Sequence, residues 1–561
     1  MVQTTCPQCS ASFEVTKDDL ALYDKVSPVI NGEKYQIPPP SICPDCRQQR
    51  RLAYRNERNF YQRTCDKTGS ICVSVYSPDK PCTVYDQTVW WSDDWDQLAT
   101  GREYDFSKSF FEQHYELSKV APRPCILNMS SENAKFTNHS AYNKNCYMCI
   151  NTGYCEDCYY LSNFSPEDKD CMDCMAIQNC ELCYYCIDTK KSHSSSYLHW
   201  CIDCTDCHFC EDCHSCQNCF GCWNLRHKKY CIFNKQYSPE KYKEEIEKIK
   251  PHDWSSTVDF LNDFQDKVKK EAVFKYASIE NYDNATGDYI YGSKNIKKSY
   301  NIIECEDLSY CYDCGDIKFC IDTIEPYHGE LQHESHGCNL GYALNACSKC
   351  YECNNLLYSQ YCWYCKDCFG CFGIRNKQYC ILNKQYSKNE YYELVPKIIE
   401  KMIADKDWGE FFPIRLSLFA YNETAAQQYY PLTKDEIENK GWNWIEENND
   451  IPEVEKTIPA NQLPDSIEDI PDDILNWAIK CDITNRPFRI VPQELDFYRR
   501  MKLPIPHLHP DERHKQRMKL RNPRKLWKRK CDKCEKDIQT SYDPERPESV
   551  LCEECYLKEV Y

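Results

Sequence analysis

The sequence predicts a mainly β protein in which two duplicated, cysteine-lined β-solenoid blocks, each followed by an α-helical segment, lie between two small four-cysteine modules. Three observations lead to this fold class. A cysteine occupies every third position from Cys201 to Cys222. A segment of the middle of the chain recurs at an offset of 149 residues. Paired Cys-x-x-Cys motifs stand near both ends.

The triplet spacing of the cysteines matches neither the period of a helix nor the strict alternation of a strand. It is typical of a solenoid whose short strands are broken by frequent turns, with one small inward residue on each side. Asp or Asn often precedes the cysteine, as at Asp203, Asp206, Asp212 and Asn218. These residue types tolerate the left-handed backbone that a tight corner requires. Stacked turns would then share one continuous core.

The second copy indicates what the triplet cysteines do. Segment 230–238 recurs as segment 379–387, and in the second copy the triplet positions hold isoleucine, leucine and serine as well as cysteine. Cys207 and Cys210 align with Leu356 and Ser359. Leucine and isoleucine cannot bind zinc, whereas cysteine also serves as a small buried hydrophobe. The exchange favours interior packing, with a buried metal site among the triplets as the alternative.

Composition changes along the chain divide it into nine expected segments. They are an N-terminal zinc ribbon with a basic helix (1–64), a β-rich connecting segment (65–142), solenoid block 1 (143–237), a helical segment (238–280), solenoid block 2 (281–386), a second helical segment (387–432), an acidic Pro-punctuated linker with short helices (433–478), a degenerate zinc-ribbon copy with a basic run (479–530) and a C-terminal zinc ribbon (531–561).

The terminal cysteine sets have the spacing of structural zinc sites. The later set is Cys531-x2-Cys534-x17-Cys552-x2-Cys555, and the earlier one is Cys6, Cys9, Cys43 and Cys46. Two such pairs supply four thiolates in tetrahedral reach and leave no position open for water. We expect two structural zinc ions that contribute folding energy rather than catalysis.

The N-terminal segment contains Cys6-Pro-Gln-Cys9, Phe13, Leu22-Tyr23 and Cys43-Pro-Asp-Cys46-Arg47. With these motifs, residues 3–58 resemble the "probable zinc-ribbon" domain family, whose pattern is a CxxC, a phenylalanine, a short helix with a Phe-Tyr or Leu-Tyr pair, then proline and CPxCR. This copy carries a longer insert, 33 residues between Cys9 and Cys43. The resemblance implies zinc and no settled activity. A degenerate second copy near 481–522 places Cys481, Thr484, His509 and Glu512 at the ligand positions. The whole chain resembles large uncharacterised cysteine-rich zinc-ribbon proteins of uncultured bacterial lineages, which implies no function.

Two basic segments adjoin the terminal cysteine sets in a chain whose net charge is −18. Their arginines and lysines are interleaved with aromatic residues, as in surfaces that contact phosphates and stack on bases. They predict a nucleic-acid or ribonucleoprotein partner, with solvated surface charge or a protein partner as the alternatives. The candidate residues are Arg47, Arg50, Arg51, Arg55, Arg58, Arg517, Lys519, Arg521, Arg524 and Lys525.

A repeated Cys-Ile-Asp-Thr motif precedes two histidine-containing stretches, which are candidates for a pocket or, alternatively, for surface loops. The residues are Asp188, His193 and His199 in the first copy and Asp322, His328, His333 and His336 in the second. The sequence shows no phosphate-binding glycine loop, nucleophile elbow or HExxH motif.

These features favour a non-enzymatic zinc-binding scaffold. The alternatives are a β-solenoid enzyme acting on carbohydrate and a metal-storage protein. The chain has 44 cysteines, its first residues lack the basic and apolar stretches typical of a signal peptide, and no apolar run is long enough to span a membrane. We therefore expect a cytoplasmic protein with reduced thiols and no membrane contact.

Overall fold

The computed structural model describes residues 2–249, 253–315, 323, 354–446, 454 and 456–561. Strands make up 29% of the structure and helices 27%. The expected abundance of strands is confirmed, but helix is nearly as common, so strand does not dominate. Within these residues, no helix has both the length and the apolar composition needed to cross a lipid bilayer.

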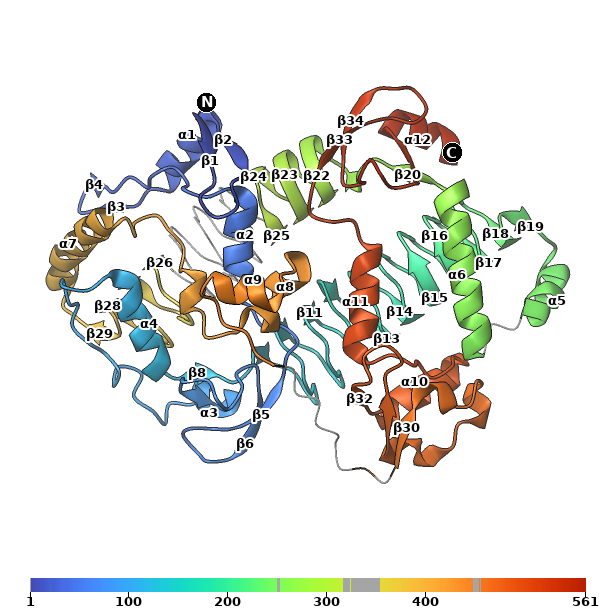
Figure 1. Ribbon diagram of the computed structural model, residues 1–561, viewed down its shortest axis with the longest axis horizontal. Helices are drawn as coiled ribbons and strands as arrows, with labels where there is room; N and C mark the ends of the chain where they lie inside the picture. Colours follow the sequence, from blue (N-terminus) through green and yellow to red (C-terminus); the bar gives the residue numbers. More distant parts are fainter. Residues whose placement is uncertain (1, 250–252, 316–322, 324–353, 447–453, 455) are drawn as a thin grey trace.

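Short parallel strands between residues 128 and 232 form a long ladder (Figure 1). Paired residues are twelve positions apart, since Cys171 lies opposite Cys183 and Cys183 lies opposite Ser195. One extra residue raises the offset to thirteen where Tyr159 lies opposite Met172. The strands are β9 (Asn128–Met129), β10 (Ser140–Ala141), β11 (Thr152–Gly153), β12 (Ser165–Pro166), β13 (Lys169–Met172), β14 (Glu181–Tyr184), β15 (His193–His199), β16 (His208–Glu211), β17 (Gln217–Phe220) and β18 (Lys229–Ile232).

A second ladder, described at residues 279–315 and 354–381, repeats this arrangement. Leu356 lies opposite Cys368, and Cys368 lies opposite Cys380, again at an offset of twelve. A bulge lies between Ala285, which is paired with Ile296, and Gly287, which is paired with Ser299. The offset is therefore eleven before the bulge and twelve after it. The strands are β21 (Ile279–Glu280), β22 (Asp283–Tyr291), β23 (Lys294–Ile303), β24 (Glu306–Ser309), β25 (Tyr312–Gly315), β26 (Asn354–Leu357), β27 (Lys366–Phe369) and β28 (Gln378–Ile381).

Both ladders end in the same antiparallel hairpin. β18 pairs with β19 (Lys235–Gln236), and β28 pairs with β29 (Lys384–Gln385), 149 residues later. Both central residues of each turn have positive φ: Phe233 and Asn234 in the first, Leu382 and Asn383 in the second. Such two-residue turns match the twist of the flanking strands. The sequence duplication is thus a duplication of structure at this end of each block.

Left-handed corners recur at every third residue of the ladders. Asp203, Asp206, Asp212 and Asn218 have φ values of 56°, 49°, 50° and 53°, which confirms the corners predicted from the sequence. Tyrosine, phenylalanine and leucine also occupy such corners, as at Leu182. Left-handed backbone is unfavourable for these larger residues, so the stacked neighbours must hold it in place.

The interior of each ladder is lined by the residue that follows each corner. In the first ladder this core is almost entirely cysteine, and in the second it contains isoleucine and leucine as well. Cys207 and Cys210 are fully buried, as are Leu356 and Ser359 at the aligned positions. The packing role predicted from the exchange of residues is consistent with this burial.

Helices follow each ladder and cover its outer surface. α6 (Trp254–Glu271) packs Phe260 against Phe209 and Phe220 of the first ladder. α7 (Lys388–Asp405) follows the second and starts with the predicted capping box of Ser387 and Glu390. The other helices are α1 (Lys17–Val26), α2 (Pro44–Leu52), α3 (Gln87–Trp91), α4 (Phe110–Val120), α5 (Pro239–Ile249), α8 (Ala425–Tyr429), α9 (Lys434–Asn439), α10 (Pro492–Met501), α11 (Pro510–Leu520) and α12 (Glu553–Val560).

Candidate metal centres

The C-terminal cysteine set is assembled from a hairpin and a helix start. Cys531 and Cys534 lie in the turn between β33 (Trp527–Lys530) and β34 (Asp537–Thr540), and Cys552 caps α12. The four sulfur atoms lie within 4.8 Å of one another, with 3.7 Å between those of Cys534 and Cys552. Only Cys534 is exposed. The set is compact enough to hold one metal ion.

Backbone N–H groups point at the sulfur of Cys531. The N–H of Cys552 donates to it at 3.2 Å. Burial alone would raise the pKa of this thiol, but backbone hydrogen bonds from Cys552, Cys534 and Lys533 lower it to about 6. Donors of this kind favour the thiolate, which is the form that binds metal.

The N-terminal cysteine set has the same construction. Cys6 and Cys9 lie in the turn between β1 (Val2–Thr5) and β2 (Ser12–Val15), and Cys43 caps α2. The four sulfur atoms again lie within 4.8 Å of one another, with 3.6 Å between those of Cys9 and Cys43. A hydrogen bond from the Cys46 thiol lowers the pKa of Cys43. Both predicted ligand sets are therefore brought together in space.

The degenerate copy keeps the hairpin turn of these modules. The N–H of Cys481 donates to the carbonyl of Arg486 at 3.1 Å, as that of Cys531 donates to Lys536 at 2.8 Å. His509 caps α11 at the position that Cys552 holds before α12. Its Nδ1 accepts the N–H of Asp511 at 3.1 Å. This copy positions α11 rather than gathering four thiols.

Carbonyl oxygens surround the sulfur atoms of the ladder cysteines, although a backbone N–H also donates to Cys174 (3.3 Å) and to Cys222 (3.4 Å). The Cys204 sulfur lies 3.6 Å from the carbonyl oxygen of Ile202 and 3.2 Å from that of Cys213, and the same two contacts recur along the ladder. A carbonyl oxygen can only accept a hydrogen bond, and only the neutral thiol has a hydrogen to donate, so this environment favours the neutral thiol. Among the described residues, no ladder cysteine belongs to a group of three or more potential ligands. Both observations favour packed thiols over a metal cluster.

Serine also fits the inward positions, where it shares with cysteine the contact to the carbonyl two residues earlier and in addition accepts a backbone N–H. The Ser192 hydroxyl donates to the carbonyl of Lys190 at 3.2 Å and accepts the N–H of Cys204, twelve residues on, at 3.2 Å. Asp168 also occupies an inward position, where one carboxylate oxygen accepts the N–H of Cys180 at 2.8 Å and the other has no hydrogen-bond partner. Burial raises the pKa of Asp168 to about 8.

The arginines expected to contact nucleic acid in the N-terminal segment are buried. Arg47 donates to the carbonyl of Ile42 at 2.7 Å, and Arg50 forms an ion pair with Glu410 at 2.7 Å. The remaining three are buried as well, and their side chains contact Gln48, Glu57 and Asp511; they are Arg51, Arg55 and Arg58. In this arrangement their guanidinium groups are turned away from solvent.

The C-terminal arginines bind corner aspartates of the ladders. Arg517 pairs with Asp173 at 2.7 Å, Arg521 with Asp188 at 2.9 Å and Arg524 with Asp313 at 2.6 Å. All three aspartates have left-handed backbone. Figure 1 shows α11 lying along β13 and β14. Of the ten candidates, Lys519 and Lys525 are exposed.

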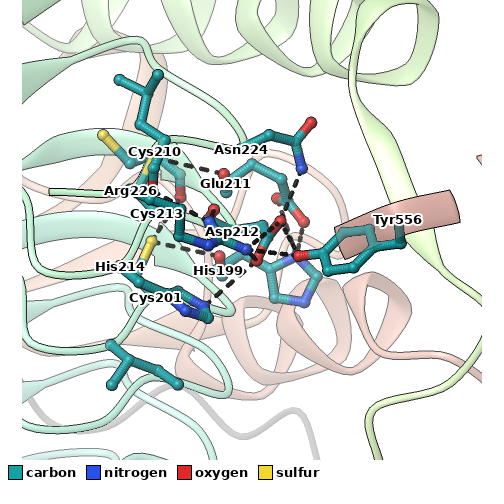
Figure 2. A network of polar contacts seen from close by, with 12 residues as sticks. His199, Cys201, Cys210, Glu211, Asp212, Cys213, His214, Asn224, Arg226 and Tyr556 are labelled. Carbon is teal, nitrogen blue, oxygen red and sulfur yellow. Dashed lines mark hydrogen bonds and ion pairs between the residues drawn. The ribbon is translucent and has the colours of Figure 1, made fainter. Parts of the chain in front are cut away.

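The sequence analysis did not predict that the corner aspartates form ion pairs with arginines of the same chain. The signal was present in part, because these aspartates stand at the triplet corner positions. Asp212 repeats the pattern, since it pairs with Arg226 at 2.9 Å and accepts a hydrogen bond from Tyr556 of α12 (Figure 2). Corner aspartates thus bind both the degenerate copy and the C-terminal module.

The first copy of the expected pocket is partly assembled. His199 Nδ1 lies 3.0 Å from a carboxylate oxygen of Glu211 (Figure 2). Its Nε2 lies 4.0 Å from a carboxylate oxygen of Asp188. Burial acts to lower the pKa of His199. The carboxylates of Glu211 and Asp188 raise it by more than burial lowers it, so the pKa lies above its usual value. The side chains of Asp188 and Glu211 are only 10% and 9% exposed.

The other members of this set lie elsewhere. His193 is exposed at the start of β15, one strand length away from His199. Asp322, His328, His333 and His336 fall outside the described residues. Glu211, which the sequence did not single out, is the residue that binds His199 most closely.

Searches of protein-family models, curated proteins and solved structures find no match to this chain. The resemblance of residues 3–58 to zinc ribbons therefore stays a prediction, and the arguments below rest on the geometry alone.

Proposed function

We propose that this protein is a non-enzymatic zinc-binding scaffold. In this proposal, two cysteine-lined β-solenoid blocks form the body, and zinc-bearing modules dock on it. The observation that carries the proposal is the buried ion pairing of α11, where Asp173 binds both Arg513 and Arg517. All three side chains are at most 3% exposed. Such pairing joins parts of the chain into one rigid surface.

Zinc is the metal that best fits the two tetracysteine sets. Four thiolates in a closed set suit its tetrahedral geometry, and a site with no open position serves folding. The solenoid interpretation is supported by the offset of twelve that recurs in both ladders. Since Asp188 and Arg521 pair with each other, the partly assembled pocket is occupied by the protein's own docking contact.

Nucleic acid as a partner is proposed on a narrower basis than the sequence indicated. Eight of the ten candidates are arginines that are buried or bound to acidic side chains, so phosphate contact would depend on exposed lysines such as Lys519 and Lys525. The acidic net charge of −18 leaves a protein partner as the alternative.

The zinc content of matched variants tests the proposal. Cys9 and Cys534 are the exposed members of the two sets. We expect Cys9→Ser and Cys534→Ser each to lose one zinc ion per chain relative to the wild type, measured by elemental analysis of the dialysed protein. Limited proteolysis of Cys534→Ser should also release the last ~30 residues, because closed zinc sites supply folding energy. Unchanged zinc in both variants, or eight or more ions per wild-type chain, would contradict the proposal.

A further inference from the structure

A fourth hairpin turn, at Cys65, has the backbone geometry of the metal-binding turns. It joins β5 (Tyr61–Thr64) to β6 (Ile71–Ser74). The N–H of Cys65 donates to the carbonyl of Ser70 at 2.8 Å, and the N–H of Gly69 donates to the carbonyl of Cys65 at 2.9 Å. The turn at Cys531 has the same two bonds, 2.8 and 2.9 Å long.

The match continues to the helix that follows. The N–H of Asp86, which caps α3, donates to the sulfur of Cys65 at 3.2 Å across 21 residues. The N–H of Cys552 donates to Cys531 at the same distance and the same separation. Asp66 accepts the N–H of Val84 at 2.7 Å, as Asp532 accepts that of Val550. Residues 61–91 are therefore built like the C-terminal module.

The ligand positions of this module have changed. Thr68 and Val89 stand where the C-terminal module has Cys534 and Cys555, so the usual set of four thiols is absent here. Asp86 stands where that module has Cys552. A carboxylate thus occupies a ligand position at the start of the helix.

Two other cysteines meet this carboxylate. Cys72 lies on β6, and Cys125 follows β8 (Arg123–Pro124) directly. The two sulfur atoms and one oxygen of Asp86 lie within 4.8 Å of one another. Cys72 and Cys125 are 7% and 2% exposed. Two backbone hydrogen bonds fix the position of Cys125. Its carbonyl accepts the N–H of Val75 at 3.0 Å, and its own N–H donates to the carbonyl of Tyr85 at 2.9 Å.

We propose that Cys72, Cys125 and Asp86 form a third metal site, which binds Zn²⁺. Two thiolates and one carboxylate are ligands that zinc accepts, and thiolates exclude harder ions such as Mg²⁺. Oδ1 of Asp86 accepts the N–H of Thr88 at 2.9 Å as the helix cap, and a carboxylate has a second oxygen for a metal. Three protein ligands leave one coordination position for an exchangeable fourth ligand. This site is separate from both tetracysteine sets.

Zinc content again provides the test, on the full chain. We expect three ions per wild-type chain and two in Cys125→Ser. Asp86→Asn should also hold two zinc ions. Because Asn caps helices as well as Asp does, the loss of zinc in this variant is not explained by loss of the helix cap. Cys65→Ser is the matched control. It removes the sulfur that corresponds to Cys531 but not one of the proposed ligands, and it should keep three ions.

Three results would overturn the site. The first is a wild type with two zinc ions while Cys9→Ser and Cys534→Ser each lose one. The second is retention of all three ions in both Cys125→Ser and Asp86→Asn. The third is a disulfide between Cys72 and Cys125 in peptides of the unreduced native protein. The first of these leaves the tetracysteine proposal intact, so failure of the two proposals can be distinguished.

Discussion

Replacing Asp173 with asparagine tests whether buried ion pairs hold α11 on the first ladder. Asp173 is fully buried and pairs with Arg513 and Arg517. Asp170, one corner earlier, pairs with Arg500, whose side chain is 44% exposed. Both aspartates are left-handed, with φ of 53° and 49°. Asparagine tolerates this conformation, so both substitutions remove a charge without straining the backbone.

The two variants should differ in magnitude. Removing one partner of a buried ion pair costs about 3–5 kcal/mol, because the other charge is left buried and unpaired. Asp173→Asn keeps an acceptor oxygen, and Glu494 still pairs with Arg513 at 3.3 Å, so we expect about 3 kcal/mol. The exposed pair of Asp170 and Arg500 is worth about 0–1 kcal/mol.

Hydrogen exchange of the backbone amides of α11, followed by mass spectrometry, measures this difference locally. A loss of about 3 kcal/mol in the opening free energy corresponds to ~100-fold faster exchange. For Asp170→Asn, whose partner Arg500 lies on α10, we expect at most about fivefold faster exchange in that helix and none in α11. Equal and small accelerations in the two variants would refute the argument that this buried pairing holds α11 in place.

Three further predictions concern the ladder interior and the exposed lysines. Because its folded pKa of about 8 lies above the usual value of 3.8, protonated Asp168 stabilises the protein below about pH 4, and this contribution is lost as pH rises to 8. Asp168→Asn should therefore melt higher than the wild type at pH 8 and differ less at pH 5; equal differences at both would contradict the buried charge. The double change Cys207→Leu and Cys210→Ser should cost about 1–3 kcal/mol, because leucine adds carbon atoms to a packed core, and loss of bound metal from this variant would show that these thiols are ligands. If the chain binds RNA or DNA in a filter assay, Lys519→Ala with Lys525→Ala should reduce the salt slope by about two, and no retention at low salt would leave a protein partner as the proposal.

Features set by neighbouring residues were predictable from the sequence. The corners at Asp203 and Asn218 follow from the tolerance of Asp and Asn for left-handed backbone, and the start of α7 follows from a capping box. The tetracysteine sets were predictable because two CxxC pairs at this spacing are typical of four thiolates that surround one tetrahedral metal ion. Each of these inferences needs residues close in sequence or a rule of metal chemistry.

The destination of the arginines was not predictable in the same way. Arg517 pairs with Asp173 across 344 residues, and Arg524 with Asp313 across 211. Charge in a sequence gives the number of cations but not which of them the fold buries. A run of basic residues therefore looked like a phosphate-binding surface, whereas most of its arginines bind the protein's own acidic corners.

The tetracysteine sets and most of the ladder cysteines differ in what surrounds the sulfur, although a backbone N–H also donates to Cys65, Cys174 and Cys222. In the C-terminal module a backbone N–H points at Cys531, which stabilises the thiolate that a metal requires. In the ladder, carbonyl oxygens lie beside the sulfur of Cys204, and only a protonated thiol can donate to them. Serine donates to such a carbonyl too, as Ser192 does. Cysteine and serine can therefore both occupy inward positions of the ladder, while both tetracysteine sets consist of cysteine alone.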